Sequence, residues 1–200
     1  MEVEAKFLAP PAVFVELREL AAIGPFLFAP DSEPETQRNI YYDTADQRMR
    51  AGRYGLRVRH IGSRQIATLK SAATLNNGVY TRGEWEQDVP GDDPRTWPEG
   101  ELRARVLALI GDAPLQPILE IQTSRQHIYA TNEGERFAEI SLDEGEFIAD
   151  ERREHFQELE IELLPGADRA NFDVLVQLLR TRFPLTPEPR SKLERGLMLW

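Results

Sequence analysis

The strongest constraint on this chain is a set of segments in which apolar and charged residues alternate with a period of two. This is the pattern of β-strands, because successive side chains of a strand point to opposite faces of its sheet. The clearest segments are residues 2–7, 55–61, 66–70, 82–89, 138–143 and 158–163, and the less regular ones are 39–42 and 119–130. Turn sequences at residues 76–78 and 132–134 favour antiparallel hairpins, so we expect a large antiparallel sheet of about eight strands.

Helical periodicity occurs in fewer segments. Residues 13–23, 101–110 and 168–182 carry apolar side chains at the spacing of one helix face, and Asp168 is a candidate N-cap of the third. Ser191 and Glu194 form a capping-box pattern that predicts a short last helix. Strands and helices are interleaved, so the sequence predicts an α+β protein.

The second face of the predicted strands is composed mostly of Glu, Asp, Arg and Lys. Side chains at i and i+2 lie roughly 7 Å apart on one face, so Glu2 and Glu4 repel each other unless a cation lies between them. Arg57 and Arg59 repel in the same way unless an anion is present. One interpretation is a solvated face with ion pairs between strands. The other is a barrel with a charged interior, in which carboxylates hold a divalent metal and basic residues hold a polyanion.

Composition narrows the classes of protein further. The chain has 34 acidic and 24 basic residues and a formal charge of −10, which argues against a nucleic-acid or anionic-membrane binder. It contains no cysteine, which excludes disulfides, thiol catalysis and cysteine-ligated metal. Neither a signal peptide nor an apolar run near the ~20 residues of a membrane-spanning helix is visible. We expect a single domain over residues 1–200, located in the cytoplasm.

The common catalytic motifs are absent from the sequence. There is no GxxxxGK[ST] phosphate loop, no GxGxxG and no GxSxG, so P-loop, Rossmann and α/β-hydrolase chemistry lack support. The three histidines, His60, His127 and His155, lack the spacing of metal ligands and are interpreted as structural. Trp97 lies in a Pro-rich loop, where it would either cover the mouth of a tunnel or be partly exposed.

A series of short motifs resembles the CYTH domain family, the triphosphate tunnel metalloenzymes. In chain order the motifs are Glu2-x-Glu4-x-Lys6, Tyr41-Tyr42-Asp43-Thr44, Gly55-Leu56-Arg57-Val58-Arg59, Thr68-Leu69-Lys70, Arg82-x-Glu84-Trp85-Glu86, Arg125, Leu142-Asp143, Glu158-x-Glu160 and Ser191-Lys192-Leu193-Glu194-Arg195-Gly196. They run from residue 2 to residue 196, so the resemblance covers essentially the whole chain. It implies a closed eight-stranded antiparallel β-barrel, a tunnel with a charged interior and helices packed outside.

The resemblance also implies an activity. Members of this family use Mg²⁺ or Mn²⁺ to act on triphosphate or polyphosphate compounds, so we expect a metal-dependent triphosphatase, with inorganic tripolyphosphate as the favoured substrate. The alternatives are a class IV adenylate cyclase that converts ATP to cyclic AMP, a thiamine or nucleoside triphosphatase, and a non-catalytic polyphosphate-binding module. A cyclase of that class would carry a His-Phe pair shortly before the glutamate motif, which here begins at Glu2. The resemblance further implies a homodimer.

The residues that carry these roles follow from the motifs. The expected phosphate-binding residues are Lys6, Arg57, Arg59, Lys70, Arg82, Arg125 and Lys192. The expected metal ligands are Glu2, Glu4, Asp143, Glu158 and Glu160, since hard divalent cations take oxygen ligands. Within these sets, catalysis is assigned to Glu2, Glu4, Lys6, Asp143 and Glu160. The remaining carboxylates on the same faces, Glu84, Glu86, Glu139 and Glu162, are interpreted as balancing charge, with a purely structural role equally open.

Overall fold

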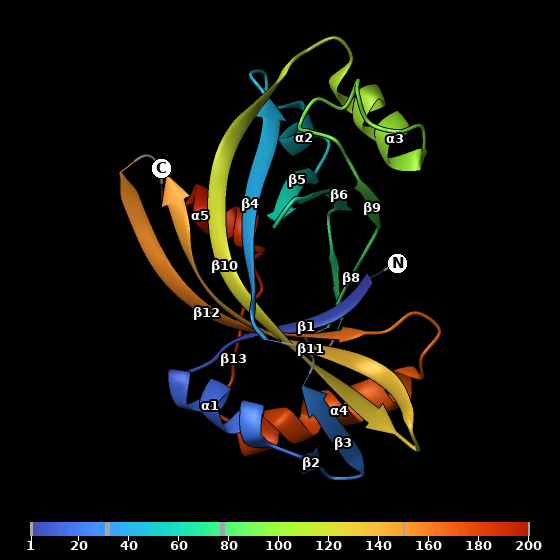
Figure 1. Ribbon diagram of the computed structural model, residues 1–200, viewed down its shortest axis with the longest axis vertical. Coiled ribbons are helices and arrows are strands. Elements are labelled where there is room, and N and C mark those ends of the chain that lie inside the picture. Colours follow the sequence, from blue (N-terminus) through green and yellow to red (C-terminus); the bar gives the residue numbers. More distant parts are fainter. Residues whose placement is uncertain (1, 31–32, 77–78, 150, 200) are drawn as a thin grey trace.

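The computed structural model describes residues 2–30, 33–76, 79–149 and 151–199. Its centre is one antiparallel sheet that curls into a nearly closed barrel (Figure 1). The barrel strands are β1 (Glu2–Leu8), β4 (Glu35–Thr44), β5 (Tyr54–Ile61), β6 (Arg64–Ser71), β8 (Val79–Arg82), β9 (Glu84–Asp88), β10 (Leu115–Asn132), β11 (Glu135–Ala149) and β12 (Arg152–Leu163). Their order around the barrel is β8-β1-β12-β11-β10-β4-β5-β6-β9. The short strands β7 (Thr74–Asn76), β13 (Thr186–Pro187), β2 (Ala22–Ile23) and β3 (Phe26–Pro30) extend this sheet at β8, β1 and β10.

The two ends of this strand order meet at Gly83. Strand β8 pairs with β1 and β9 pairs with β6, and only Gly83 separates β8 from β9 along the chain. The backbone N–H of Ser71 donates to the Gly83 carbonyl at 3.0 Å, and the Gly83 N–H donates to the Ser71 hydroxyl at 2.9 Å. The barrel therefore has nine strands, one more than predicted, because the segment predicted at 82–89 is divided at Gly83.

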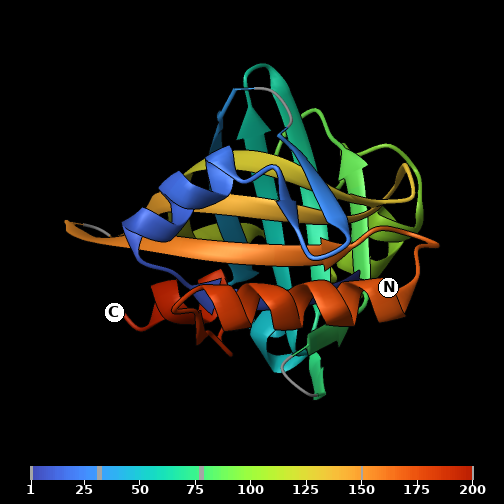
Figure 2. The same cartoon turned by 90° about the horizontal axis from the view of Figure 1, so that it is seen from below.

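The apolar faces of the strands point outward and are covered by helices. On one side α1 (Pro11–Glu19) and α4 (Arg169–Arg182) pack against β11 and β12 (Figure 2). Phe14 and Phe172 of these helices are buried in one apolar cluster with Ile140 and Ile161. On another side α3 (Glu101–Ile110) covers β5 and β6. Burial of these apolar faces outside the barrel leaves the charged faces to line its interior.

A small apolar cluster lies on the interior strand faces. Ile121, Phe147 and Phe156 share their strand faces with Arg125, Asp143 and Glu158, because each pair is separated by an even number of residues. Leu193 of α5 (Lys192–Leu197) packs against this cluster. A Cβ atom at Gly196 would lie 2.3 Å from the Leu119 side chain, so glycine there allows α5 to approach β10 closely.

The local predictions agree with most of these elements. Helix α3 occupies the predicted residues, the Asp168 carboxylate accepts from the Ala170 N–H at 3.0 Å, and Ser191 and Glu194 form the predicted capping box. Helix α1 ends at Glu19, earlier than predicted, because Ile23 belongs to β2. Glu133 and Gly134 have the positive φ of a tight hairpin. The turn predicted at residues 76–78 includes positions outside the described residues.

The prediction that Trp97 covers the mouth of a tunnel or is partly exposed is wrong. Its side chain is 2% exposed and packs in the apolar cluster under α3, outside the barrel. Its indole N–H donates to the Gly91 carbonyl at 2.7 Å. Among the described residues, no helix is both long enough and apolar enough to cross a membrane.

Candidate active site

The barrel interior holds the charged residues that the sequence analysis selected. Glu4 is 3% exposed, and Asp143 and Glu158 are 0% exposed. The β1–β12 register places Lys6 opposite Glu160 and Glu4 opposite Glu162. The solvated-face interpretation is therefore wrong for these strands, since the charges are buried within the barrel and must be balanced there.

One charged network connects β1, β6, β8 and β9. The Arg82 guanidinium lies 2.8 Å from Glu4 Oε1 and also contacts Glu2, while Lys70 Nζ lies 2.7 Å from Glu2 and 3.1 Å from Glu84. Burial raises the pKa of Glu2, but the nearby Lys70 and Arg82 outweigh it and bring that pKa to about 2. Glu2 is therefore ionised under all ordinary conditions.

A second network connects β10, β11 and β12 with α5. Arg125 donates from Nε to Asp143 at 2.6 Å and from Nη2 to Glu160 at 2.6 Å. Lys192 Nζ contacts all three carboxylates of Asp143, Glu158 and Glu160, at 2.9 Å from Asp143 and 2.7 Å from Glu160. The ion pairs hold the pKa of Asp143 below its usual value against the effect of burial.

Arg195 joins this second network, although the sequence analysis gave it no role. Its guanidinium lies 2.5 Å from Glu158 Oε2. The signal was present in the sequence, because residues three apart on a helix lie on the same face, and Arg195 follows Lys192 by three residues.

Several carboxyl groups of the lining have raised pKa values. Burial raises the pKa of Glu158 to about 7, with Glu160 adding to the shift and Lys192 opposing it. Burial also raises the pKa of Glu162 to about 8, helped by the charge of Glu2. Burial raises the pKa of Glu4 too, with Arg82 opposing it and Glu160 adding to it. At these three carboxyl groups the neighbouring basic residues do not fully offset the effect of burial.

Arg57 and Arg59 differ from the other basic residues of the lining. Within the described part of the chain, neither lies within ion-pair distance of a carboxylate. Arg57 donates to the Thr68 hydroxyl at 3.4 Å and its Nε is buried without a partner, and Arg59 donates to Asn39 at 3.3 Å. Burial, with repulsion from Arg57 and Arg125, lowers the pKa of Arg59 to about 9. Two adjacent arginines without carboxylate partners are suited to bind an anion.

The chain has only three lysines, Lys6, Lys70 and Lys192, and all three lie in this interior. Lys6 Nζ donates to the Arg190 carbonyl at 3.0 Å, lies 4.0 Å from Glu4 and is 5.0 Å from the centre of the Tyr80 ring. Lys6 therefore connects β1 to the segment that leads into α5, in addition to facing the interior.

Two groups of carboxylates have the chemistry of a metal site. Glu2, Glu84 and Glu162 form one group, and Asp143, Glu158 and Glu160 form the other. In each group one oxygen per residue lies within 4.8 Å of the others. A set of oxygen donors fits Mg²⁺ or Mn²⁺. Glu84 and Glu162 were interpreted as charge-balancing, whereas Glu4, an expected ligand, belongs to neither group and is bonded to Arg82.

His127, interpreted as structural, also faces the interior. Its Nδ1 lies 2.7 Å from Glu139 Oε1 and 3.3 Å from the Ser141 hydroxyl. The hydroxyl and the carboxylate meet the same ring nitrogen, so these three residues do not form the relay of a catalytic triad, in which they contact opposite ring nitrogens. The other two histidines do not face the lining: His155 is exposed and His60 lies on the outward face of β5.

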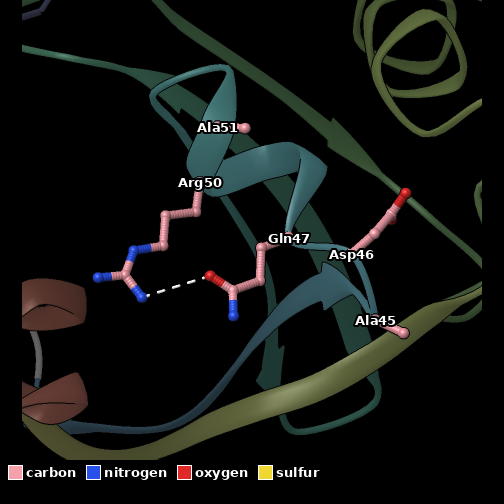
Figure 3. A pocket seen from close by; sticks show the side chains of 5 residues that line it. All are labelled: Ala45, Asp46, Gln47, Arg50 and Ala51. Atoms are coloured by element: carbon pink, nitrogen blue, oxygen red, sulfur yellow. Dashed lines mark hydrogen bonds between the residues drawn. The ribbon is translucent and has the colours of Figure 1, made fainter.

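One motif residue has a structural role outside the lining. The Asp43 carboxylate accepts hydrogen bonds from the backbone N–H groups of Thr44, Met49 and Arg50, which fixes the turn around α2 (Arg48–Ala51). A shallow depression beside this turn is lined by Ala45, Asp46, Gln47, Arg50 and Ala51 (Figure 3). Arg50 donates to Gln47 there at 3.4 Å, and none of the five lining residues belongs to the charged networks described above.

The fold and its interior define a class of protein, an antiparallel barrel whose interior is lined by buried charged residues. The family model described as the CYTH domain matches residues 1–197, and the chain belongs to this family. An inorganic triphosphatase of Haemophilus influenzae is 26% identical over 199 residues, which are 99% of this chain and 54% of that protein. The chain thus spans about half the length of this relative.

Solved structures agree on the fold. A putative adenylyl cyclase of Hippeastrum, described as having a dominant triphosphatase activity, superposes with a TM-score of 0.72 at 21% identity, covering 99% of this chain and 96% of that one. A putative adenylate cyclase of Bacillus halodurans gives a TM-score of 0.68 at 23% identity, covering 98% and 96%. The PH1819 protein of Pyrococcus horikoshii gives 0.66 at 23% identity and covers 100% of both chains. At these identities the likeness establishes the barrel fold.

Proposed function

We propose that this protein hydrolyses the terminal phosphoanhydride bond of triphosphate compounds in a reaction that depends on Mg²⁺ or Mn²⁺, and that inorganic tripolyphosphate is its substrate. One observation carries the proposal. Arg57 and Arg59, which pair with no carboxylate of the described residues, face the same interior as two groups of convergent carboxylates. This arrangement suits an anion that binds together with divalent cations.

The basic residues of the lining bind the phosphates in this proposal. The protein carries a formal charge of −10 and repels a polyanion at long range, so attraction must come from the local cluster and from bound cations. Arg57 and Arg59 offer planar guanidinium groups that donate to two oxygens at once. The set is completed by five further basic residues, which are Lys6, Lys70, Arg82, Arg125 and Lys192. To bind phosphate, these side chains must exchange their present contacts with carboxylates for contacts with phosphate oxygens.

The two carboxylate groups, with Glu4 beside the first, are the proposed metal ligands. A divalent cation held by these residues would neutralise charge on the phosphate oxygens and would polarise the attacking water molecule. The catalytic assignment of Glu2, Glu4, Lys6, Asp143 and Glu160 stays part of the proposal, with Glu84 and Glu162 added to the metal-binding set. Glu139 is paired with His127 instead and is left out of this set.

Hydrolysis by this arrangement needs no covalent intermediate with the protein. Water attacks the terminal phosphorus, the bond from that phosphorus to the bridging oxygen breaks, pyrophosphate leaves and the proton of the water passes to solvent. The arginines hold the non-bridging oxygens in place and stabilise the charge that develops on them, which is the main requirement of phosphoryl transfer.

The choice of inorganic tripolyphosphate over other triphosphates rests on two points. The relative from Haemophilus influenzae is named an inorganic triphosphatase. Trp97, an aromatic side chain of the kind that could stack on a thiamine ring at the mouth of the barrel, lies outside the barrel. The test is phosphate release from tripolyphosphate, ATP and thiamine triphosphate, with cyclic AMP measured in parallel. Cyclic AMP formation would favour the cyclase, and binding without turnover would favour the polyphosphate-binding module. The homodimer remains a prediction.

A further inference from the structure

Lys192 occupies the centre of the second carboxylate group. Its Nζ lies within ion-pair distance of Asp143, Glu158 and Glu160 at once, so one ammonium serves all three carboxylates. The side chain is 11% exposed. The ammonium donates hydrogen bonds to Glu158 and Glu160 and lies 2.9 Å from Asp143, so its charge is shared among the three carboxylates. In this state the group that would hold a divalent cation already holds a cation supplied by the chain.

The first carboxylate group is less completely occupied. Lys70 Nζ lies within ion-pair distance of Glu2 and Glu84, and in the described structure no basic residue pairs with Glu162, the third member. The two groups therefore differ in what a metal ion must displace. At Glu2, Glu84 and Glu162 one ligand is free of ion pairs, whereas at Asp143, Glu158 and Glu160 every ligand is engaged by Lys192.

We propose that Lys192 is an internal counter-cation that a divalent metal must displace to enter the Asp143–Glu158–Glu160 group, so that the two metal sites fill in sequence. The inference rests on the proposed function and deepens it, because it assigns an order to the binding of cations. The Glu2–Glu84–Glu162 group fills first. The second group fills only when the Lys192 ammonium leaves it.

The local structure permits this movement without a change in the fold. The capping box of Ser191 and Glu194 fixes the start of α5, and Arg195 holds Glu158 independently of Lys192. The ammonium of Lys192 is attached through a flexible four-carbon stem, so it can move while the helix stays in place. Arg125 continues to neutralise Asp143 and Glu160 after the ammonium departs.

Displacement would also couple metal binding to substrate binding. In the closed network Lys192 is neutralised by carboxylates and adds little attraction for an anion. Once a divalent cation takes its place, both the metal and the released ammonium face the interior, and the local charge becomes more positive by the full charge of the metal. Binding of a polyphosphate is therefore expected to tighten in step with occupancy of the second site, and the coupling is reciprocal.

The experiment measures Mn²⁺ binding without substrate, by titration calorimetry and by the electron paramagnetic resonance signal of free Mn²⁺. Wild-type protein should show a tighter and a weaker site. Lys192→Met keeps the length of the side chain but removes the ammonium, and it should tighten the weaker site by about tenfold or more. Lys70→Met is the matched control, which should act on the tighter site and leave the weaker one unchanged.

A second measurement uses unmodified protein. Since the chain has only three lysines, amine acylation followed by mass spectrometry reports each of them separately. Saturating Mn²⁺ should increase acylation of Lys192 several-fold, while Lys6, which donates to a backbone carbonyl, serves as the internal reference. This inference alone would be overturned if the protein binds two Mn²⁺ ions while the acylation of Lys192 stays unchanged and the Mn²⁺ affinity of the weaker site is the same in Lys192→Met as in the wild type. Failure to bind Mn²⁺ at all would overturn the proposed function with it.

Discussion

The Arg82 guanidinium lies 2.8 Å from the Glu4 carboxylate, and the same arginine also contacts Glu2. One cation thus holds both carboxylates of the N-terminal motif on the wall of the barrel. This contact explains how two glutamates can sit two residues apart on a buried strand face, where they would otherwise repel each other. It also makes Glu4 the most informative single position for testing the function.

Glu4→Gln is expected to lower metal-dependent phosphate release by roughly 100-fold or more, because the amide removes a charge that the metal and Arg82 both need. The amide oxygen still accepts from Arg82, so the thermal unfolding midpoint should stay close to that of wild type. The control is Glu16→Gln, because Glu16 is a half-exposed carboxylate of α1 that pairs with Arg182. Unchanged turnover in a folded Glu4→Gln protein would contradict the assignment.

Arg57→Ala should weaken tripolyphosphate binding by roughly tenfold or more, since charged hydrogen bonds to the anion are lost. The dependence of binding on salt should become shallower, because one cation fewer contacts the anion. The measurement is titration calorimetry at several salt concentrations. Arg64→Ala removes an exposed arginine paired with Asp88 and should leave binding unchanged. If Arg57→Ala binds as tightly as wild type, Arg57 serves only the packing around Thr68.

Glu162→Gln is expected to stabilise the metal-free protein at alkaline pH. Burial raises the pKa of Glu162 to about 8 in the folded state, against an ordinary value of 4.5 in the unfolded chain. Between these two values the folded state keeps a proton that the unfolded state has lost, so wild-type stability falls as pH rises through this interval. Gln has no such proton to lose. When unfolding by urea is measured in EDTA, the free energy of unfolding of the variant should increase relative to that of the wild type from pH 5 to pH 8.

The exposed carboxylate of Glu19 provides the comparison for this effect. Glu19→Gln removes one exposed carboxylate and is measured under the same conditions as the control for the loss of a charge. A Glu162→Gln protein whose advantage does not change with pH would show that the carboxyl group is not protonated in the folded barrel.

Gly145→Ala tests the barrel wall itself. A Cβ atom at Gly145 would lie 2.2 Å from the backbone carbonyl of Gln122 on the paired strand, so the strands must separate. The expected cost is about 1–3 kcal/mol in the free energy of unfolding, or more if the pairing is lost. Gly91→Ala, where an added Cβ atom would meet no atom of the described residues within 4 Å, should change it by about 0.5 kcal/mol or less. Equal effects of the two substitutions would contradict the β10–β11 register.

The sequence predicted the strands and their charged faces because both depend on a period of two, which is a local property. The helix start at Asp168 and the capping box at Ser191 were predictable for the same reason. The division of β8 from β9 at Gly83 was missed, because it depends on Ser71 of a neighbouring strand. Trp97 was misplaced because a Pro-rich loop gives no sign of the apolar cluster that buries its side chain.

The sequence predicted which residues line the barrel interior, but it did not predict which of them contact one another. The period placed Glu84 and Glu162 on the same faces as Glu2, yet only the barrel brings the three together. Glu4 is the second glutamate of the N-terminal motif, but it pairs with Arg82 and belongs to neither carboxylate group. The pairing of His127 with Glu139 depends on strand register, which the spacing of histidines does not reveal.

The measurement that tests the account most directly is phosphate release from inorganic tripolyphosphate, followed with Mg²⁺, with Mn²⁺ and with EDTA. Equal amounts of phosphate and pyrophosphate, formed rapidly with metal and abolished by EDTA, are the predicted result. ATP and thiamine triphosphate should be turned over much more slowly under the same conditions. Tight binding of tripolyphosphate that persists in EDTA, with no phosphate released by either metal, would contradict the account and identify the barrel as a binding module.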